Sequence, residues 1–134
     1  MASIKRHRLI LLFGLTLVLA LAGCAGSSIK VNWRGSSGTT QQTASYETFT
    51  GQERATIRLE AGDTLTLAYE VEVAKGSLTL AVDDPDGETV WEQTFEEGDG
   101  ATVVVPTTGD GRYTLRIVGD DTGGRFNVSW RVGE

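Results

Sequence analysis

From Tyr46 to the end of the chain, apolar and polar residues alternate with a period of two. In the clearest run, the residues that share one face are Leu65, Leu67, Tyr69, Val71 and Val73. Strict alternation is typical of half-buried antiparallel strands, whereas an amphipathic helix needs a period of 3.6 residues, which does not occur after residue 24. The alternating segments are 56–60, 64–73, 77–83, 89–95, 101–105, 112–118 and 125–132. This pattern predicts a domain of short β-strands.

Clusters of Gly and Asp separate these segments, at 60–63, 74–76, 83–87, 96–100, 108–111 and 120–124. Both residue types favour turns, because Gly adopts positive φ without steric cost and Asp bonds to nearby backbone. Short strands joined by such turns predict an all-β fold, a single antiparallel, jelly-roll-like β-sandwich of about 7–8 strands. A closed barrel is the alternative.

Residues 25–45 are rich in Gly, Ser, Thr and Gln. Such a segment has too little apolar surface to offset its conformational entropy, so we expect a flexible tether over 24–45 and the folded domain over 46–134. A tether of about 20 residues reaches roughly 25 Å. Within it, Ile29–Trp33 alternates like a strand. Whether this segment joins a sheet edge stays open at the level of sequence.

The first 23 residues have the layout of a secretory signal peptide. A positive stretch ends at Arg8, and Leu9–Ala22 is apolar apart from Gly14 and Thr16. A membrane span needs about 20 apolar residues, and this run is shorter and ends in small residues. We therefore expect residues 1–23 to be removed, with an uncleaved anchor helix as the alternative.

The apolar run closes with Leu21, Ala22, Gly23 and Cys24, which resemble a bacterial lipobox. The resemblance implies that the Cys24 sulfur receives a diacylglyceryl group and that a peptidase cuts before Cys24. It also implies that the new amino terminus is often acylated. Cys24 is the one cysteine of the chain and has no disulfide partner within it. A free thiol or an intermolecular disulfide is the alternative.

Lipidation would place the protein in the cell envelope, outside the cytoplasm. Two or three acyl chains hold a protein stably at a membrane, whereas one holds it reversibly. Residue 25 is Ala, whereas Asp at that position in Gram-negative lipoproteins resembles an inner-membrane retention signal. The resemblance therefore implies the inner leaflet of the outer membrane in a Gram-negative organism. In other bacteria it implies the outer face of the plasma membrane.

Charge and composition exclude several functions. Three of the twelve basic residues precede Cys24, so the remainder has nine basic and eighteen acidic residues. A net charge of −9 argues against a nucleic-acid partner, because phosphate binding needs a positive surface. The one His and the one Cys also lie in the first 24 residues. This excludes most nucleophilic triads and most zinc or haem sites, so we predict no enzyme, no catalytic residue and no cofactor.

Asp83, Asp84 and Asp86 form the most suggestive acidic cluster. Calcium prefers several carboxylate oxygens, so these residues are calcium candidates, although the spacing does not fit an EF-hand loop. The alternative is a hairpin turn, with Pro85 at its second position and Gly87 supplying positive φ.

The three tryptophans offer possible binding surfaces, since aromatic side chains are favoured anchors. Trp130 shares a face with Phe126, which predicts that it is buried. Val90 and Trp91 cannot both point inward in a regular strand, which predicts a bulge or one exposed side chain. Trp33, on the expected tether, is the best candidate for an exposed aromatic. Trp33 and Trp91 are therefore candidates for partner binding.

The chain closes with segment 111–117, a Gly-rich turn, and segment 124–130. This arrangement resembles the end of small bacterial jelly-roll domains of the pre-peptidase C-terminal type and related GOLD-like sandwiches. Segments 59–65 and 84–87 also fit the style of these domains, and the resemblance covers roughly residues 46–132. The resemblance implies an accessory, adhesive or partner-binding module. Fold-level likeness does not fix the function.

Two functions remain in view. The first is a non-catalytic module that binds an envelope protein. The alternative is a carbohydrate-binding or calcium-stabilised adhesion module. An apolar groove or a bare edge strand would favour the protein partner, exposed coplanar aromatics would favour a glycan, and three converging carboxylates would favour calcium.

Overall fold

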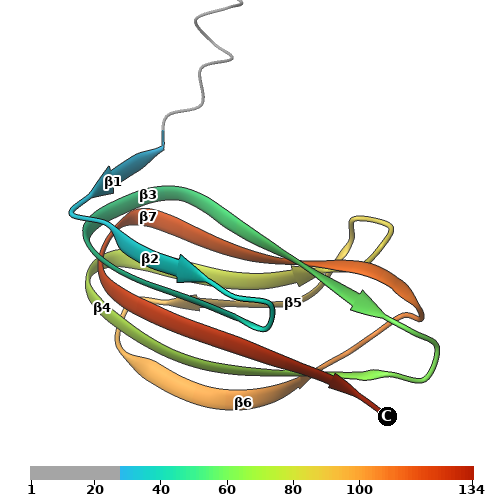
Figure 1. The fold of residues 1–134 in the computed structure, drawn as a ribbon. Helices are drawn as coiled ribbons and strands as arrows, with labels where there is room; N and C mark the ends of the chain where they lie inside the picture. The colour runs from blue at the N-terminus through green and yellow to red at the C-terminus, as the bar shows by residue number, and fades with distance from the viewer. Residues whose placement is uncertain (1–27) are drawn as a thin grey trace, which may run out of the picture.

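A computed structural model describes residues 28–134, which form seven β-strands (Figure 1). The strands are β1 (Ile29–Val31), β2 (Arg34–Ser37), β3 (Gln41–Leu59), β4 (Thr64–Asp83), β5 (Thr89–Phe95), β6 (Asp99–Val105) and β7 (Gly111–Gly133). No helix within residues 28–134 is long and apolar enough to cross a membrane. The predicted signal peptide and Cys24 lie outside the described residues, so both stay predictions.

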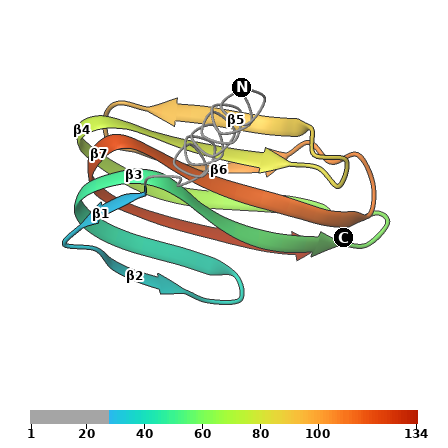
Figure 2. The same ribbon diagram turned by 90° about the horizontal axis from the view of Figure 1, so that it is seen from above.

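Three long strands, β3, β4 and β7, pass through both layers of a sandwich (Figures 1 and 2). We call residues 41–46, 64–73 and 124–133, with β2 and β6, the front layer, in the order β2–β3–β7–β4–β6. Residues 51–59, 77–83 and 111–119, with β5, form the back layer, in the order β3–β7–β4–β5. All pairings are antiparallel, which confirms the predicted all-β sandwich.

The long strands bend between the layers at one end of the molecule, on the left of Figure 1. Each bend coincides with a shift of register, near residues 46–51 in β3, 73–77 in β4 and 119–124 in β7. The predicted turns at 74–76 and 120–124 are therefore bends within continuous strands. Segments 64–73 and 77–83 belong to one strand, and so do 112–118 and 125–132.

Positive φ values explain why Gly and Asp occupy these bends. Gly76 has a φ of 63°, Asp121 of 46° and Gly124 of 139°. A Cβ atom on Gly124 would also overlap the backbone carbonyl of Glu72 on the neighbouring strand. The residues that favour a tight turn therefore also allow a strand to bend while its neighbours approach closely.

The inner faces of the two layers form the core. Buried front-layer side chains come from Ala44, Tyr46, Leu65, Leu67, Tyr69, Val71, Val105, Phe126, Val128 and Trp130. Those of the back layer come from Ile57, Leu59, Leu78, Leu80, Val82, Phe95, Tyr113, Leu115 and Ile117. The period of two predicted the inward positions from Ile57 onward, and Trp130 is buried as predicted, whereas Ala44 lies in the expected tether and Ala101, predicted to point inward, is exposed.

The domain begins before the predicted boundary at residue 46. In β1, Ile29 pairs with Thr50 of β3, so the Ile29–Trp33 segment does contribute a strand to the sheet. In β2, Arg34–Ser37 pairs with 42–45, and Ala44 is buried. The tether expected over 24–45 is therefore mostly part of the domain. The prediction of a tether from composition was wrong for this segment, because small polar residues can form an edge strand whose backbone is hydrogen-bonded to β3.

We expect Gly124→Ala to lower the free energy of unfolding by at least about 2 kcal/mol, because the new Cβ meets backbone at an unfavourable φ. Urea denaturation measures this loss. Gly133→Ala is the matched control, since nothing lies within 4 Å of its Cβ position. Equal stability of the two variants would contradict the role given to this bend.

Candidate functional site: a polar trough on the front layer

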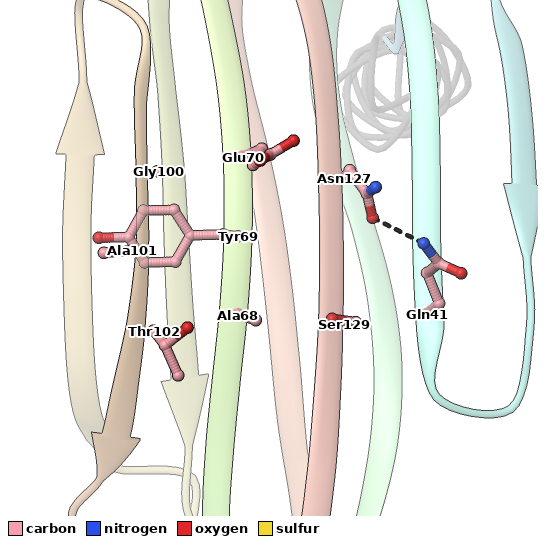
Figure 3. Close-up of a pocket in the computed structure, with 9 residues that line it drawn as sticks. All are labelled: Gln41, Ala68, Tyr69, Glu70, Gly100, Ala101, Thr102, Asn127 and Ser129. Atoms are coloured by element: carbon pink, nitrogen blue, oxygen red, sulfur yellow. Dashed lines mark hydrogen bonds between the residues drawn. The ribbon is translucent and has the colours of Figure 1, made fainter.

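The outer surface of the front layer carries two adjoining hollows. The first, of about 470 Å³, is lined by Gln41, Ala68, Tyr69, Glu70, Gly100, Ala101, Thr102, Asn127 and Ser129 (Figure 3). The second, of about 260 Å³, is lined by Arg34, Thr43, Ala44, Ser45, Glu70, Arg125, Phe126 and Asn127. Glu70 and Asn127 line both hollows, and we call the combined surface the polar trough.

The register of the strands arranges the side chains of the trough in rows. One row crosses the strands through Gln41, Ser129, Ala68 and Thr102. The next row runs through Thr43, Asn127, Glu70 and Gly100. Neighbouring strands lie about 4.8 Å apart, so a row of four strands spans about 14 Å.

Differences in side-chain size shape the first hollow. Ala68, Gly100 and Ser129 keep its floor low, while longer polar side chains rise beside them (Figure 3). The Tyr69 ring belongs to the inner face of the layer and packs 5.1 Å from Phe95, measured between ring centroids. Burial, with a smaller effect of the Asp99 charge, raises the pKa of Tyr69. Its hydroxyl is therefore neutral at pH 7.

Two carboxamides meet at one side of the first hollow. The Nε2 of Gln41 donates a hydrogen bond to the Oδ1 of Asn127 over 2.8 Å (Figure 3). This contact fixes both amides and leaves the Oε1 of Gln41 and the Nδ2 of Asn127 to accept from and donate to a ligand. Directly across from Asn127, Glu70 adds an acceptor. The trough therefore matches groups that both donate and accept hydrogen bonds, as hydroxyls do.

The charged groups of the trough carry both signs. Arg125 Nη2 lies 3.0 Å from Glu72 Oε1, and both side chains are more than half exposed. Arg34, on β2, lines the second hollow. Glu70 lines both hollows and is the only carboxylate among their lining residues. Sequence reasoning missed this site, because its members are ordinary outward polar residues until the strand order brings them together.

Trp33 packs against the core and is only half-exposed, in contrast to the exposed position expected on a tether. Its ring stacks on Tyr46 with centroids 5.6 Å apart and lies 5.0 Å from Phe49. The Lys30 ammonium covers it at 4.4 Å from the ring centroid. The same burial raises the pKa of Tyr46 to about 12. Trp33 therefore joins β1 and β2 to the sandwich.

Trp91 is also half-buried, with its ring centroid 6.0 Å from that of Tyr69. The predicted bulge is present, because Trp91 pairs with Val82 while Thr89 pairs with Asp83, which leaves Val90 without an opposite residue. No tryptophan is fully exposed within residues 28–134. The partner-binding roles considered for Trp33 and Trp91 stay predictions, and neither residue lines the polar trough.

Asp83 is held by its neighbours in the back layer. Its Oδ2 accepts a bond from Arg116 Nε over 2.6 Å, and its Oδ1 accepts bonds from Arg116 Nη2 and Thr89 Oγ1. The hydrogen bonds from Arg116 are the main cause that lowers the pKa of Asp83, with burial opposing them. Both carboxylate oxygens of Asp83 are therefore engaged in hydrogen bonds within the fold.

Asp84 organises the turn that follows β4. Its buried carboxylate accepts the backbone N–H groups of Asp86 and Glu88, each over 2.9 Å. The Gly87 N–H donates to the Asp84 carbonyl, Pro85 occupies the second turn position, and Gly87 has a φ of 86°. This is the hairpin turn that was the alternative to calcium. Across residues 28–134, no three His, Cys, Asp or Glu side chains converge as metal ligands.

Comparisons with known proteins identify the fold. No protein-family model matches the chain, and no curated protein matches its sequence. The structure is similar to that of a CBM4 carbohydrate-binding module at 15% identity and a TM-score of 0.50, over 84% of this chain and 82% of that chain. At this identity the similarity shows the β-sandwich fold alone.

Two further structures have lower scores. TmCBM61, in complex with beta-1,4-galactotriose, has 15% identity and a TM-score of 0.49 over 77% of this chain and 88% of that chain. Carbohydrate-binding module CBM36, in complex with calcium and xylotriose, has 13% identity and a TM-score of 0.42 over 81% of this chain and 100% of that chain. The resemblance to pre-peptidase C-terminal domains stays a prediction.

We expect Arg116→Gln to lower the free energy of unfolding at pH 7 by about 1 kcal/mol, because Asp83 loses its charged donor. The Asp83 pKa is lower in the folded state than in the unfolded state. The stabilisation from the Asp83–Arg116 pair is therefore complete above the unfolded pKa of about 3.9, and it is lost as the pH falls through the folded pKa. Urea titrations at about pH 7 and pH 2.5 test this dependence. An equal loss at both values would contradict it, and Arg112→Gln is the control.

Proposed function

We propose that this protein is a lipid-anchored, non-catalytic carbohydrate-binding module and that the polar trough is its glycan-binding site. The observation that carries the proposal is the trough itself, in which amide, hydroxyl and carboxylate groups stand in rows on a rigid sheet. The similarity to a CBM4 module supports the proposal at the level of fold.

The chemistry of the trough suits a neutral glycan. Each sugar hydroxyl donates and accepts, which matches the paired amides of Gln41 and Asn127 and the acceptor Glu70. The low floor at Ala68, Gly100 and Ser129 lets a sugar ring approach the sheet. Because the two aromatic side chains that line the trough, Tyr69 and Phe126, are buried in the inner face of the layer, hydrogen bonds and bridging waters supply most of the affinity.

A glycan fits this surface better than the protein partner first expected from the sequence. Neither hollow of the trough is the apolar groove that would favour a protein segment, because polar side chains line most of each. Calcium has no cluster of carboxylates to bind within residues 28–134. The alternative of a carbohydrate-binding module is therefore the better supported of the two.

The trough also favours binding over hydrolysis. Glycoside hydrolysis commonly uses two carboxyl groups that flank the scissile bond. Glu70 is the only carboxylate among the residues that line the two hollows. Burial accounts for the raised pKa of Tyr69, and the hydrogen bonds from Arg116 account for the lowered pKa of Asp83 on the back layer. The proposed role is therefore to hold a glycan and not to cleave it.

We expect the full chain, purified in detergent, to bind at least one of a panel of soluble neutral glucans, xylans and galactans. Loss of one or two hydrogen bonds in Asn127→Ala or Glu70→Gln should weaken binding about tenfold, since 1.4 kcal/mol corresponds to a factor of ten. Isothermal titration calorimetry measures both affinities.

Thr56→Ala, which changes an exposed threonine on the back layer, is the control and should bind like the unchanged protein. Absence of binding across the panel would contradict the proposed function. Equal weakening by the control and the trough variants would contradict the assignment of the site.

The anchor is the second part of the proposal. Removal of residues 1–23 and lipidation of Cys24 would hold the domain in the cell envelope, at the inner leaflet of an outer membrane or the outer face of a plasma membrane. We expect Cys24→Ser to leave the precursor at its full mass and without incorporated lipid. Metabolic labelling with a fatty acid and intact-mass measurement test this expectation, and normal labelling of the variant would contradict it.

A further inference from the structure

The outer surface of the back layer carries four arginines, and we call it the arginine face. Arg54 lies directly opposite Arg116, and Arg58 lies directly opposite Arg112, across strands β3 and β7. Like charges at directly opposite positions destabilise a sheet. Four of the nine basic residues that follow Cys24 therefore gather where the fold alone does not favour them.

The carboxylates near the arginine face only partly compensate this charge. Asp83 of β4 binds Arg116, whose pKa is also raised by the charge of Glu92 on β5. Glu60 lies 3.5 Å from Arg58, but both side chains are more than 70% exposed, so water screens this pair. Neither Arg54 nor Arg112 forms a salt bridge with a carboxylate of residues 28–134. The β3–β7 side of the face stays positive.

The remaining surface is acidic. Three of the five other cations of residues 28–134 are paired with carboxylates, in Lys30–Glu53, Lys75–Asp121 and Arg125–Glu72. The chain after the predicted signal peptide has a net charge of −9. An anionic surface would therefore repel most orientations of this domain and attract the one that presents the arginine face.

The chain enters the sandwich beside this face. The Ser28 side chain lies against Gly51, where β3 enters the back layer, and Ile29 pairs with Thr50. Arg54 lies three residues farther along the same strand, about 10 Å away. The five steps from Cys24 to Ile29 span at most about 18 Å when fully extended. A lipid on Cys24 would thus keep the start of the back layer within about 18 Å of the membrane surface.

We propose that the arginine face docks on the anionic lipid headgroups of the membrane that holds the Cys24 anchor. Guanidinium groups bind phosphate oxygens with two parallel hydrogen bonds, which suits phospholipid headgroups. The polar trough lies on the outer surface of the opposite layer and then faces away from the membrane. This inference rests on the anchor of the proposed function and not on glycan binding.

The test compares two exposed threonines on opposite layers, Thr56 beside the arginine pairs and Thr102 in the trough. Thr56→Cys and Thr102→Cys are made separately in the full lipidated chain, where the Cys24 sulfur is blocked, and are labelled with a fluorophore. Each protein is placed in vesicles of phosphatidylcholine, alone or mixed equally with phosphatidylglycerol. A headgroup nitroxide in the bilayer quenches labels that lie close to the surface.

Docking predicts strong quenching at residue 56, weak quenching at residue 102, and a preference for the phosphatidylglycerol vesicles. Quenching at residue 56 should fall by about half or more when salt rises from 0.1 M to 1 M, because the Debye length falls from about 10 Å to about 3 Å. Arg54→Gln with Arg112→Gln should give a similar loss.

Equal quenching at both positions would overturn the proposal. Quenching at residue 56 that changes neither with the lipid charge nor with the Arg54→Gln and Arg112→Gln substitutions would also overturn it. A soluble polyanion such as polygalacturonate that shields residue 56 while the vesicles do not quench it would assign the face to an anionic glycan instead. Intact-mass measurement separates these outcomes from failure of the anchor: a chain without lipid contradicts both the anchor and the docking, while neutral-glycan binding is measured independently.

Discussion

The backbone ladder of β7 is the constraint on which the sandwich depends. This strand pairs with β3 on one side and β4 on the other in both layers, so all three strands must bend together as they pass from front to back. Bending a ladder leaves backbone groups unpaired unless the register shifts and some residues adopt positive φ. Gly76, Asp121 and Gly124 meet this need, and they bring the two apolar faces together.

Because each long strand belongs to both layers, one polypeptide segment supplies two surfaces of different chemistry. The first half of β3 contributes Gln41 and Thr43 to the polar trough, and its second half contributes Arg54 and Arg58 to the arginine face. The two surfaces lie on opposite layers, so a partner on one does not obstruct the other. Recognition of a soluble glycan and contact with a membrane are therefore compatible in this geometry.

Local sequence patterns predicted the parts of the fold that depend on local chemistry. The period of two predicted which side chains point inward, and the turn residues Pro85 and Gly87 predicted the hairpin turn after β4. The sequence predicts a chain reversal near Gly124 where the structure has a bend, because positive φ is common to turns and bulges and only the pairing of distant strands distinguishes them.

The polar trough was not predictable for a related reason. Gln41 and Asn127 are 86 positions apart and become hydrogen-bonded neighbours only because β7 inserts between β3 and β4. Trp33 was expected on a tether, since its few apolar neighbours in sequence gave no sign of the ring cluster formed with Tyr46 and Phe49. Sites built across strands require the strand order, which sequence periodicity does not contain.

The position of β7 also sets the order in which the domain can form. It is the last of the seven strands in residues 28–134, yet it lies between β3 and β4 in both layers, and these two strands do not pair with each other. Folding must wait until residues 111–133 are available and then close long loops, which makes it slow relative to a fold of local contacts. A chain whose residues 111–133 have not yet been released would consequently stay unfolded, and the sandwich would assemble only once β7 is free to pair with β3 and β4.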